Sequence, residues 1–168
     1  MIKKLLLIVA LAVPMFASAQ TLKMAIVDVE DIFQSLPDTE NAKTELAKVS
    51  KMWEDELANM QAEFKSLYEA YQALGADTPD AIRERKARDL EEKNARLQQV
   101  QQQAYEELQK KQMELQQPIM MKINNAVQSV GQEGSYSMIQ MKNPENILYF
   151  AAPVEDITPL VKAKLGIK

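Results

Sequence analysis

Apolar residues repeat at intervals of seven between residues 40 and 74. Two such series run in parallel, and the steps between them alternate between three and four residues. This spacing places both series on one stripe of a helix. The residues between them are mostly charged or polar. The pattern predicts a coiled-coil-like helix over residues 40–74 with a stripe formed by Leu46, Trp53, Leu57, Met60, Phe64, Leu67 and Tyr71.

A second amphipathic pattern extends from about residue 79 to about residue 130, after a turn at residues 75–79 that contains Gly75 and Pro79. So short a connection predicts that the two helices pack antiparallel. The second helix is longer, so its last part is expected to run past the start of the first. Pro118 lies near that crossing and predicts a kink or a lost hydrogen bond there. The stripe of this helix that faces the first includes Leu97, Val100, Leu108 and Leu115.

The pattern is different at the two ends of the chain. A short apolar run near residues 25–29 is typical of a buried strand. Residues 135–141 and 147–151 read as two further strands joined by a turn, and a short helix through Val161 and Leu165 follows. These segments predict a small β body. The residues expected to build it and to join copies of it are Ile26, Val27, Val29, Ile139, Ile147, Leu148, Tyr149 and Phe150.

The first residues have the plan of a secretory signal peptide. Lys3 and Lys4 precede an apolar run over residues 5–13, and Ala17 and Ala19 form a small-residue cleavage site. We therefore expect residues 1–19 to be removed and the mature chain to be exported and soluble. The expected organisation is a body from residues 20–39 and 131–168, with the helical hairpin over residues 40–130.

Composition excludes several classes of function. Removing the two lysines of residues 1–19 leaves 18 basic and 24 acidic residues, a net charge of about −6, which is unfavourable for nucleic-acid binding. The sequence contains no His and no Cys, so the commonest general base, metal ligands and disulfides are absent. Its four glycines form no phosphate-binding motif. We expect a non-enzymatic protein with no cofactor and no metal.

The predicted fold class is α+β, a long antiparallel helical hairpin that projects from a small β body. That body comprises roughly 55 residues and buries too little apolar surface to be comfortably stable alone. Its sheet would also have free edges, and residues 147–150 carry no charge to protect one. Pairing between identical chains would address both problems, and these arguments favour neither a dimer nor a trimer.

Two groups of residues on the hairpin are candidates for binding another protein. Apolar side chains outside the predicted stripe can contact varied partners, although each is also compatible with ordinary packing. A basic cluster just after the turn can attract acidic proteins or anionic lipid headgroups, or can simply pair with neighbouring acids. The first group is Met52, Tyr68, Tyr105 and Met113, and the basic cluster is Arg83, Arg85, Lys86 and Arg88.

Several segments together resemble the Skp/OmpH family of periplasmic chaperones. They are Ala-Ile-Val-Asp-Val-Glu from residue 25, Gly-Ser-Tyr-Ser-Met-Ile from residue 134, Ile-Leu-Tyr-Phe from residue 147 and Asp-Ile-Thr from residue 156. The resemblance implies a homotrimer with three helical arms around a cavity. It also implies that the chain holds unfolded outer-membrane proteins soluble in the periplasm without ATP. Unlike the basic members of the family, this chain is acidic. An adaptor with one defined partner and a polyanion-binding protein are the alternatives.

Overall fold

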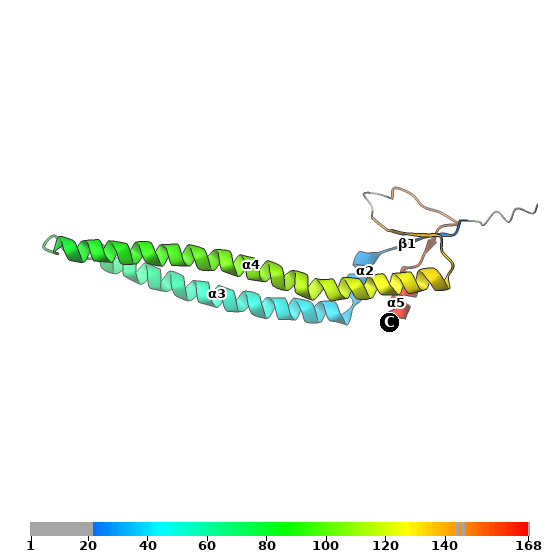
Figure 1. Cartoon of the computed structure of the whole chain (residues 1–168), viewed down its shortest axis with the longest axis horizontal. Coiled ribbons are helices and arrows are strands. Elements are labelled where there is room, and N and C mark those ends of the chain that lie inside the picture. The colour runs from blue at the N-terminus through cyan, green and yellow to red at the C-terminus, as the bar shows by residue number, and fades with distance from the viewer. Residues whose placement is uncertain (1–21, 144, 146, 168) are drawn as a thin grey trace, which may run out of the picture.

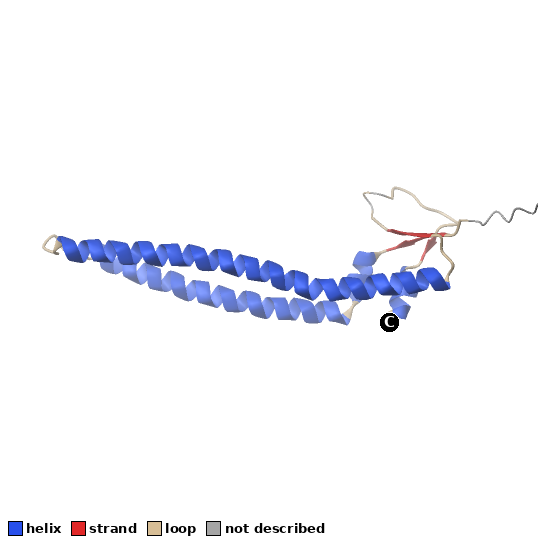
Figure 2. Ribbon diagram, in the orientation of Figure 1, coloured by secondary structure: helices blue, strands red, loops and turns tan. Residues whose placement is uncertain are grey.

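The computed structural model describes residues 22–143, 145 and 147–167, so the predicted signal peptide lies outside the described residues. Two long helices run side by side and form a hairpin, and a small body lies at the end opposite the turn (Figure 1). The body contains the short strands and the remaining helices (Figure 2). The predicted α+β fold, a long helical hairpin with a small sheet, is confirmed.

The hairpin consists of α3 (Pro37–Gln72) and α4 (Asp80–Glu133). Helix α3 begins three residues earlier than expected because Pro37 occupies its first position, where the missing N–H costs no hydrogen bond. Helix α4 continues through Pro118 and Gly131. At 1.5 Å per residue, the helices are about 54 Å and 81 Å long. The last part of α4 therefore extends beyond the start of α3 and forms one wall of the body (Figure 1).

The sheet has three parallel strands in the order β2-β1-β3. Strand β1 (Met24–Val27) is central and pairs along its whole length with β2 (Met138–Met141). Its other side pairs with the two-residue strand β3 (Glu155–Asp156). The prediction of a strand over residues 147–151 is therefore wrong, since these residues lie in a loop. Both sides of β1 are already occupied, and the loop has no strand beside it.

Helix α2 (Val29–Ser35) was missed in the sequence. Val29, expected in the first strand, is instead the first residue of this helix, because β1 ends at Val27. Asp28 is its N-cap and accepts a hydrogen bond from the backbone N–H of Asp31 at 2.9 Å. Acidic residues at positions 30 and 31 complement the positive end of the helix dipole. The capping residues are visible in the sequence. A helix of seven residues, however, is too short to show the apolar periodicity by which a helix is predicted.

The core of the body lies between the sheet, α2, the end of α4 and α5 (Thr158–Lys164). Its largest fully buried side chains are Ile32, Ile123, Ile157 and Val161, one from each of these helices and from the residue before α5. Burying such a side chain contributes about 1.5–3 kcal/mol. The core thus joins the N-terminal and C-terminal segments of the chain, and both pack against the C-terminal part of α4.

The segment Asp156-Ile157-Thr158 fastens the C-terminal end to the sheet. The Asp156 carboxylate accepts a hydrogen bond from the Thr158 N–H at 3.0 Å, and the Ile157 N–H donates to the carbonyl of Ile26 at 2.9 Å. The buried hydroxyl of Thr158 accepts from the Asp28 N–H at 2.8 Å. Each residue of the segment therefore has a specific structural role.

Two glycines lie where α4 meets β2, and Gly134 has the less room for a side chain. A Cβ atom at Gly131 would lie 2.9 Å from the Ile139 side chain, and one at Gly134 would collide with the ring of Tyr136. The absence of side chains lets the strand approach the end of the helix. Lys23 closes the same region, since its ammonium group lies 4.1 Å from the centre of the Tyr136 ring and donates to the Gly134 carbonyl at 3.1 Å.

Candidate binding surfaces of the hairpin and body

The contact surface between α3 and α4 is apolar but narrow. Met60 and Val100 are 7% and 6% exposed, and Ala104 is also buried. The other predicted members are half-buried because a pair of helices cannot enclose its own contact surface. The half-buried predicted members are Leu46, Trp53, Leu57, Phe64, Leu67, Tyr71, Leu97, Leu108 and Leu115.

Two ion pairs join the helices across this surface. Lys122 of α4 pairs with Asp38 of α3 at 2.7 Å, near the root of the hairpin, and Lys93 pairs with Glu63 nearer the turn. Both pairs are solvent-accessible, so each contributes at most about 1 kcal/mol. Their value lies in specifying which positions of the two helices face each other.

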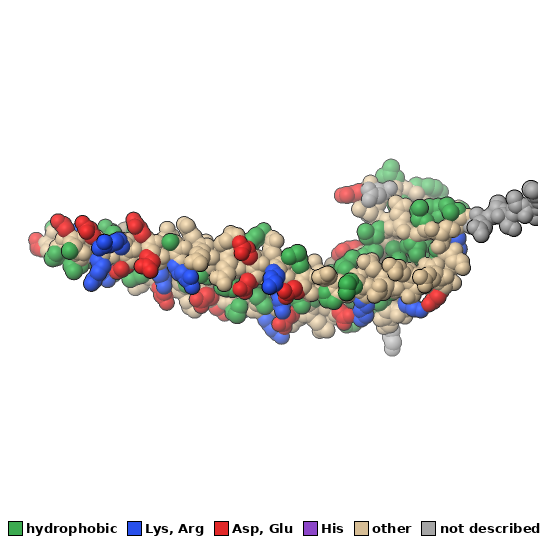
Figure 3. Space-filling view, in the orientation of Figure 1, with side chains coloured by type: hydrophobic (Ala, Val, Ile, Leu, Met, Phe, Trp, Pro, Cys, Tyr) green, Lys and Arg blue, Asp and Glu red, His purple; other side chains and the backbone are tan. Residues whose placement is uncertain are grey.

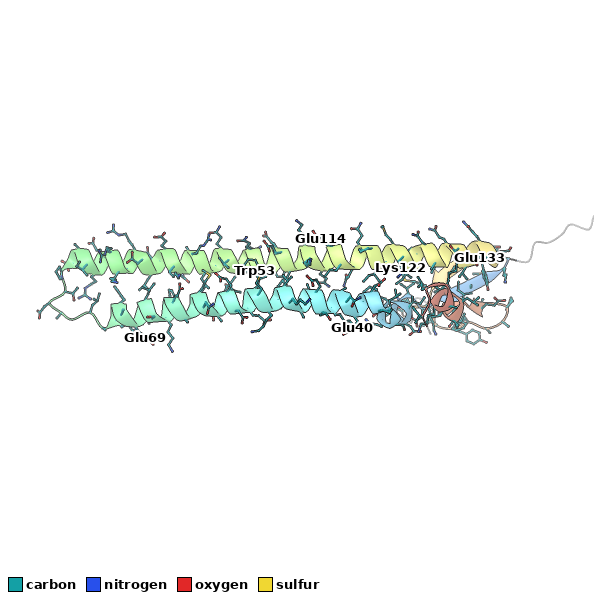
Figure 4. All side chains as sticks on the ribbon, turned by 90° about the horizontal axis from the view of Figure 1, so that it is seen from below. Glu40, Trp53, Glu69, Glu114, Lys122 and Glu133 are labelled. Carbon is teal, nitrogen blue, oxygen red and sulfur yellow. The ribbon has the colours of Figure 1, made fainter. Side chains whose placement is uncertain are left out.

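Trp53 lies between the two helices near the middle of α3 (Figure 4). Its indole N–H is buried and has no hydrogen-bond acceptor among the described residues. A buried donor without a partner costs about 1–3 kcal/mol.

The four apolar candidates outside the stripe are exposed. Met52, Tyr105 and Met113 are 56%, 60% and 63% exposed, and Tyr68 is 46% exposed. Tyr68 stacks on Phe64 with ring centres 6.3 Å apart. Hydrophobic side chains on the visible face of the hairpin are separated by charged and polar ones rather than gathered in one patch (Figure 3). The hairpin offers many small apolar contacts and no single large one.

The four residues of the basic cluster differ in their surroundings. Arg83 supports the turn, Arg85 and Arg88 are exposed, and Lys86 is half-buried. Arg83 donates to the Gly75 carbonyl at 3.1 Å, just beyond the C-terminal end of α3. That helix has no basic residue in its own last turn, so Arg83 supplies the cation that its negative end favours. In the part of the chain that the structure describes, no ion pair includes Arg85, Lys86 or Arg88.

The described residues contain no group of three His, Cys, Asp or Glu side chains placed to hold a metal ion. Among the same residues, no helix is both long enough and apolar enough to cross a membrane. The surfaces that remain as candidates are those of the hairpin and the body.

Comparison with known proteins identifies the family. Residues 23–165 match the model of the outer membrane protein (OmpH-like) family. The chain belongs to this family. It is also 29% identical over 148 residues to the chaperone protein Skp of Yersinia enterocolitica, with 88% of each chain covered. The structure of a putative outer membrane chaperone (OmpH-like) from Caulobacter crescentus CB15 superposes with a TM-score of 0.72 at 17% identity, covering 85% of this chain and 83% of that one.

The resemblance to the Skp/OmpH family in the sequence is thus confirmed. In this OmpH-like chain, the predicted body residues lie in different environments. Ile26 and Val27 are buried in β1, and Val29, Ile139 and Ile147 are half-buried. Leu148 and Tyr149 are 94% and 84% exposed, and Phe150 is 39% exposed.

The structure also reveals a groove that the sequence did not indicate. Helix α2, the C-terminal third of α4 and the end of β2 line an open groove with a volume of about 440 Å³. The lining is mixed. It consists of the apolar Val29, Phe33, Met120 and Met141 and the polar or charged Glu30, Gln116, Lys142 and Asn143. The apolar residues are up to 112 positions apart in the sequence, and α2 was not predicted. No local pattern could therefore have brought them together.

Proposed function

We propose that this OmpH-like protein is a periplasmic chaperone that binds unfolded outer-membrane proteins and prevents their aggregation without ATP. Membership of the family and the similarity to a protein named Skp chaperone support this role. The predicted signal peptide supports export. The absence of His and Cys supports a non-enzymatic role that needs no cofactor.

The observation that carries the proposal is the dispersed set of exposed Met and Tyr side chains along a hairpin tens of ångströms long. Methionine adapts to partners of varied shape, and tyrosine combines apolar area with a polar hydroxyl. Each such contact is weak, so each can form and break while the client stays bound. A chaperone that must release its client needs this kind of surface.

Assembly of identical chains would make these weak contacts effective. We propose that the bodies associate, as a homotrimer, so that several hairpins surround one client. Once one hairpin has bound, the others act at a high effective concentration, and the combined affinity rises without any new kind of contact. The small size of the body and its free sheet edges support association.

The proposal can be tested by diluting a urea-unfolded outer-membrane β-barrel protein into buffer while light scattering is followed. We expect the mature protein to suppress scattering at about one assembly per client with no nucleotide present. An unrelated acidic helical protein at the same concentration is the control. Equal aggregation with and without the protein would contradict the chaperone role and favour an adaptor with one folded partner.

A second candidate function, binding of anionic headgroups, is supported by Arg85, Lys86 and Arg88. They lie close together near the turn, and none of them forms an ion pair among the described residues. The test is binding to vesicles with and without anionic lipid. Replacing all three residues by Ala should abolish any preference for the anionic vesicles. Replacing Tyr105 and Met113 by Ala should leave that preference unchanged.

A further inference from the structure

A small hollow lies between α2, the first part of α3 and the part of α4 that faces them. It is open to solvent and has a volume of about 180 Å³. The apolar part of its lining consists of Phe33, Ala42, Leu46 and Leu115. A cavity of about 150 Å³ lined by apolar side chains can bind a molecule of the size of benzene. The hollow therefore has room for one aromatic or branched apolar side chain of a partner.

The polar part of the lining presents side-chain amides and a single charge. Of the described residues that line the hollow, Lys43 alone is charged, and its ammonium group donates to the amide oxygen of Gln34 at 2.9 Å. The hydroxyl of Thr39 donates to a backbone carbonyl of α2. The side chains of Gln112 and Gln116 are exposed and form no hydrogen bond among the described residues. Two amides in the hollow are therefore available to a partner.

These two glutamines belong to a longer row of uncharged side chains on α4. The row continues toward the turn in alternating steps of three and four residues, which keeps successive members on one side of the helix. At 1.5 Å per residue, the row is about 27 Å long. All of its members are exposed, and they are Gln98, Gln102, Tyr105, Gln109, Gln112 and Gln116.

The other side of the hairpin is charged at the same level. Residues two positions apart on a helix point in directions about 200° apart, so Glu114 lies on the side of α4 opposite Gln112. On α3, Glu45 lies opposite Lys43 for the same reason. Two further hollows on this second side are lined by charged residues, which include Asp38, Glu45, Glu114 and Lys122 in one and Glu56, Glu63, Lys93 and Arg96 in the other. Helix α4 thus presents amides on one side of the hairpin and charges on the other.

We infer that an extended segment of unfolded polypeptide binds along the glutamine row, with one apolar side chain in the hollow and its backbone hydrogen-bonded to the amides. Each residue of such a segment carries a backbone donor and a backbone acceptor, and a glutamine side chain offers both. Lysine and arginine offer only donors, and ionised acids offer only acceptors. At about 3.3 Å per residue, the row matches about eight extended residues.

This inference rests on the proposed chaperone function and identifies where on the hairpin the backbone of a client binds. Every polypeptide has the same backbone, so the site accepts segments of varied sequence that supply one apolar side chain. Neither the amides nor the backbone carries a net charge. Binding of an uncharged segment should therefore not weaken between 0.1 M and 1 M salt, and a marked loss at 1 M salt would overturn the inference.

A synthetic peptide and two pairs of substitutions test the row. The probe is an uncharged, coumarin-labelled peptide of about eight residues in which Ser and Thr alternate with Leu and Tyr. Gln112→Ala with Gln116→Ala should weaken its binding to the mature protein about 3–30-fold, the effect of losing one or two hydrogen bonds. Fluorescence anisotropy measures the affinity. Alanine favours helix, so the helical circular dichroism should stay unchanged.

The matched control is Gln103→Ala with Gln117→Ala, because both residues are exposed glutamines of α4 outside the row. This pair should leave the affinity for the peptide unchanged. An equal loss of affinity in both pairs, or failure of the peptide to bind the normal protein, would overturn the inference.

Methylation of the peptide separates recognition of the backbone from recognition of the side chains. A methyl group on every second backbone nitrogen removes the donors along one edge of an extended strand and leaves every side chain in place. Two peptides, each methylated along a different edge, are compared with the parent peptide. At least one should bind the normal protein as weakly as the parent binds the Gln112 and Gln116 double variant. Equal binding of all three peptides would overturn the inference.

The scattering assay with a full-length client separates this inference from the chaperone role. If the normal protein binds the peptide as expected but does not suppress aggregation of an unfolded outer-membrane protein, the chaperone role fails and the inferred site stands. If the normal protein suppresses aggregation while peptide binding does not depend on Gln112 and Gln116, the inferred site fails and the chaperone role stands.

Discussion

Arg83 shows how a basic residue near the start of a helix can be stabilising. Cations at a helix N-terminus oppose the dipole, so the basic residues at positions 83–88 are unfavourable for their own helix. The hairpin brings the C-terminal end of α3 next to the start of α4, and Arg83 donates to the Gly75 carbonyl at that end. Its charge thus stabilises the C-terminal end of α3, although Arg83 itself belongs to α4.

Replacing Arg83 by Ala should destabilise the turn, whereas replacing Arg85 or Arg88 should not. The interaction with the end of α3 is exposed, so the expected loss is about 0.3–1 kcal/mol. Hydrogen exchange of amides near residues 70–80 measures it, with Arg85→Ala as the matched control. Equal effects of the two substitutions would mean that charge alone, rather than the hydrogen bond, is responsible.

Ionisation of Asp156 makes the stability of the body depend on pH. Partial burial raises its pKa, but hydrogen bonds from Thr158 and from Lys142 outweigh that effect and hold the pKa below its usual value. A carboxyl group with a lowered pKa in the folded state stabilises the fold above the unfolded pKa of about 3.9. The stabilisation is lost as the pH falls through the folded pKa.

Asp156→Asn should therefore be less stable than the normal protein at pH 7, and the difference should shrink below about pH 4. Urea unfolding followed at several pH values measures the difference. Asp77→Asn, an exposed change at the hairpin turn, is the control. A difference that stays constant down to pH 2 would show that hydrogen bonding to the side chain does not depend on its charge.

At the scale of elements, the sequence predicts what depends on local periodicity. Both long helices could be predicted because their apolar spacing repeats over many turns, and the residues of the stripe lie half-buried or buried between α3 and α4. The short elements could not be assigned in this way. Strand β3 has two residues and exists because Ile157 and Thr158 anchor it beside β1. The groove depends on α2, which is too short to show a helical period.

Substitutions at Met60 and Met52 test which methionines pack between the helices and which are exposed for binding. Met60 is 7% exposed between the helices, and Met52, two turns away on the same helix, is 56% exposed. Met60→Ala should lower the free energy of unfolding of the hairpin by about 2–5 kcal/mol. Met52→Ala should change it by less than about 0.5 kcal/mol.

Thermal unfolding followed by circular dichroism measures both effects, and the scattering assay measures client holding. We expect Met52→Ala to weaken holding without a change in stability. If Met52→Ala lowers stability as much as Met60→Ala, the residue is part of the packing and not of the client surface.

At the scale of the whole molecule, net charge and local charge act in opposite directions. The full chain has a net charge of −4, which repels an acidic client at long range. Arg85, Lys86 and Arg88 lie near the start of α4, in a region where acidic and basic side chains alternate, at the end of the hairpin away from the body (Figure 1). A client can meet this region first because the hairpin extends tens of ångströms from the body.

Salt separates this electrostatic contribution from the apolar one. The screening length falls from about 10 Å at 0.1 M salt to about 3 Å at 1 M, so attraction to the exposed cations is lost while contacts with Met and Tyr persist. Holding of an acidic client by the normal protein should therefore weaken with salt to a plateau above zero. A variant with Arg85→Glu, Lys86→Glu and Arg88→Glu should bind that client more weakly at 0.1 M salt and reach the same plateau at 1 M. If holding by both proteins disappears at 1 M salt, the exposed methionines and tyrosines do not bind clients, and charge alone retains them.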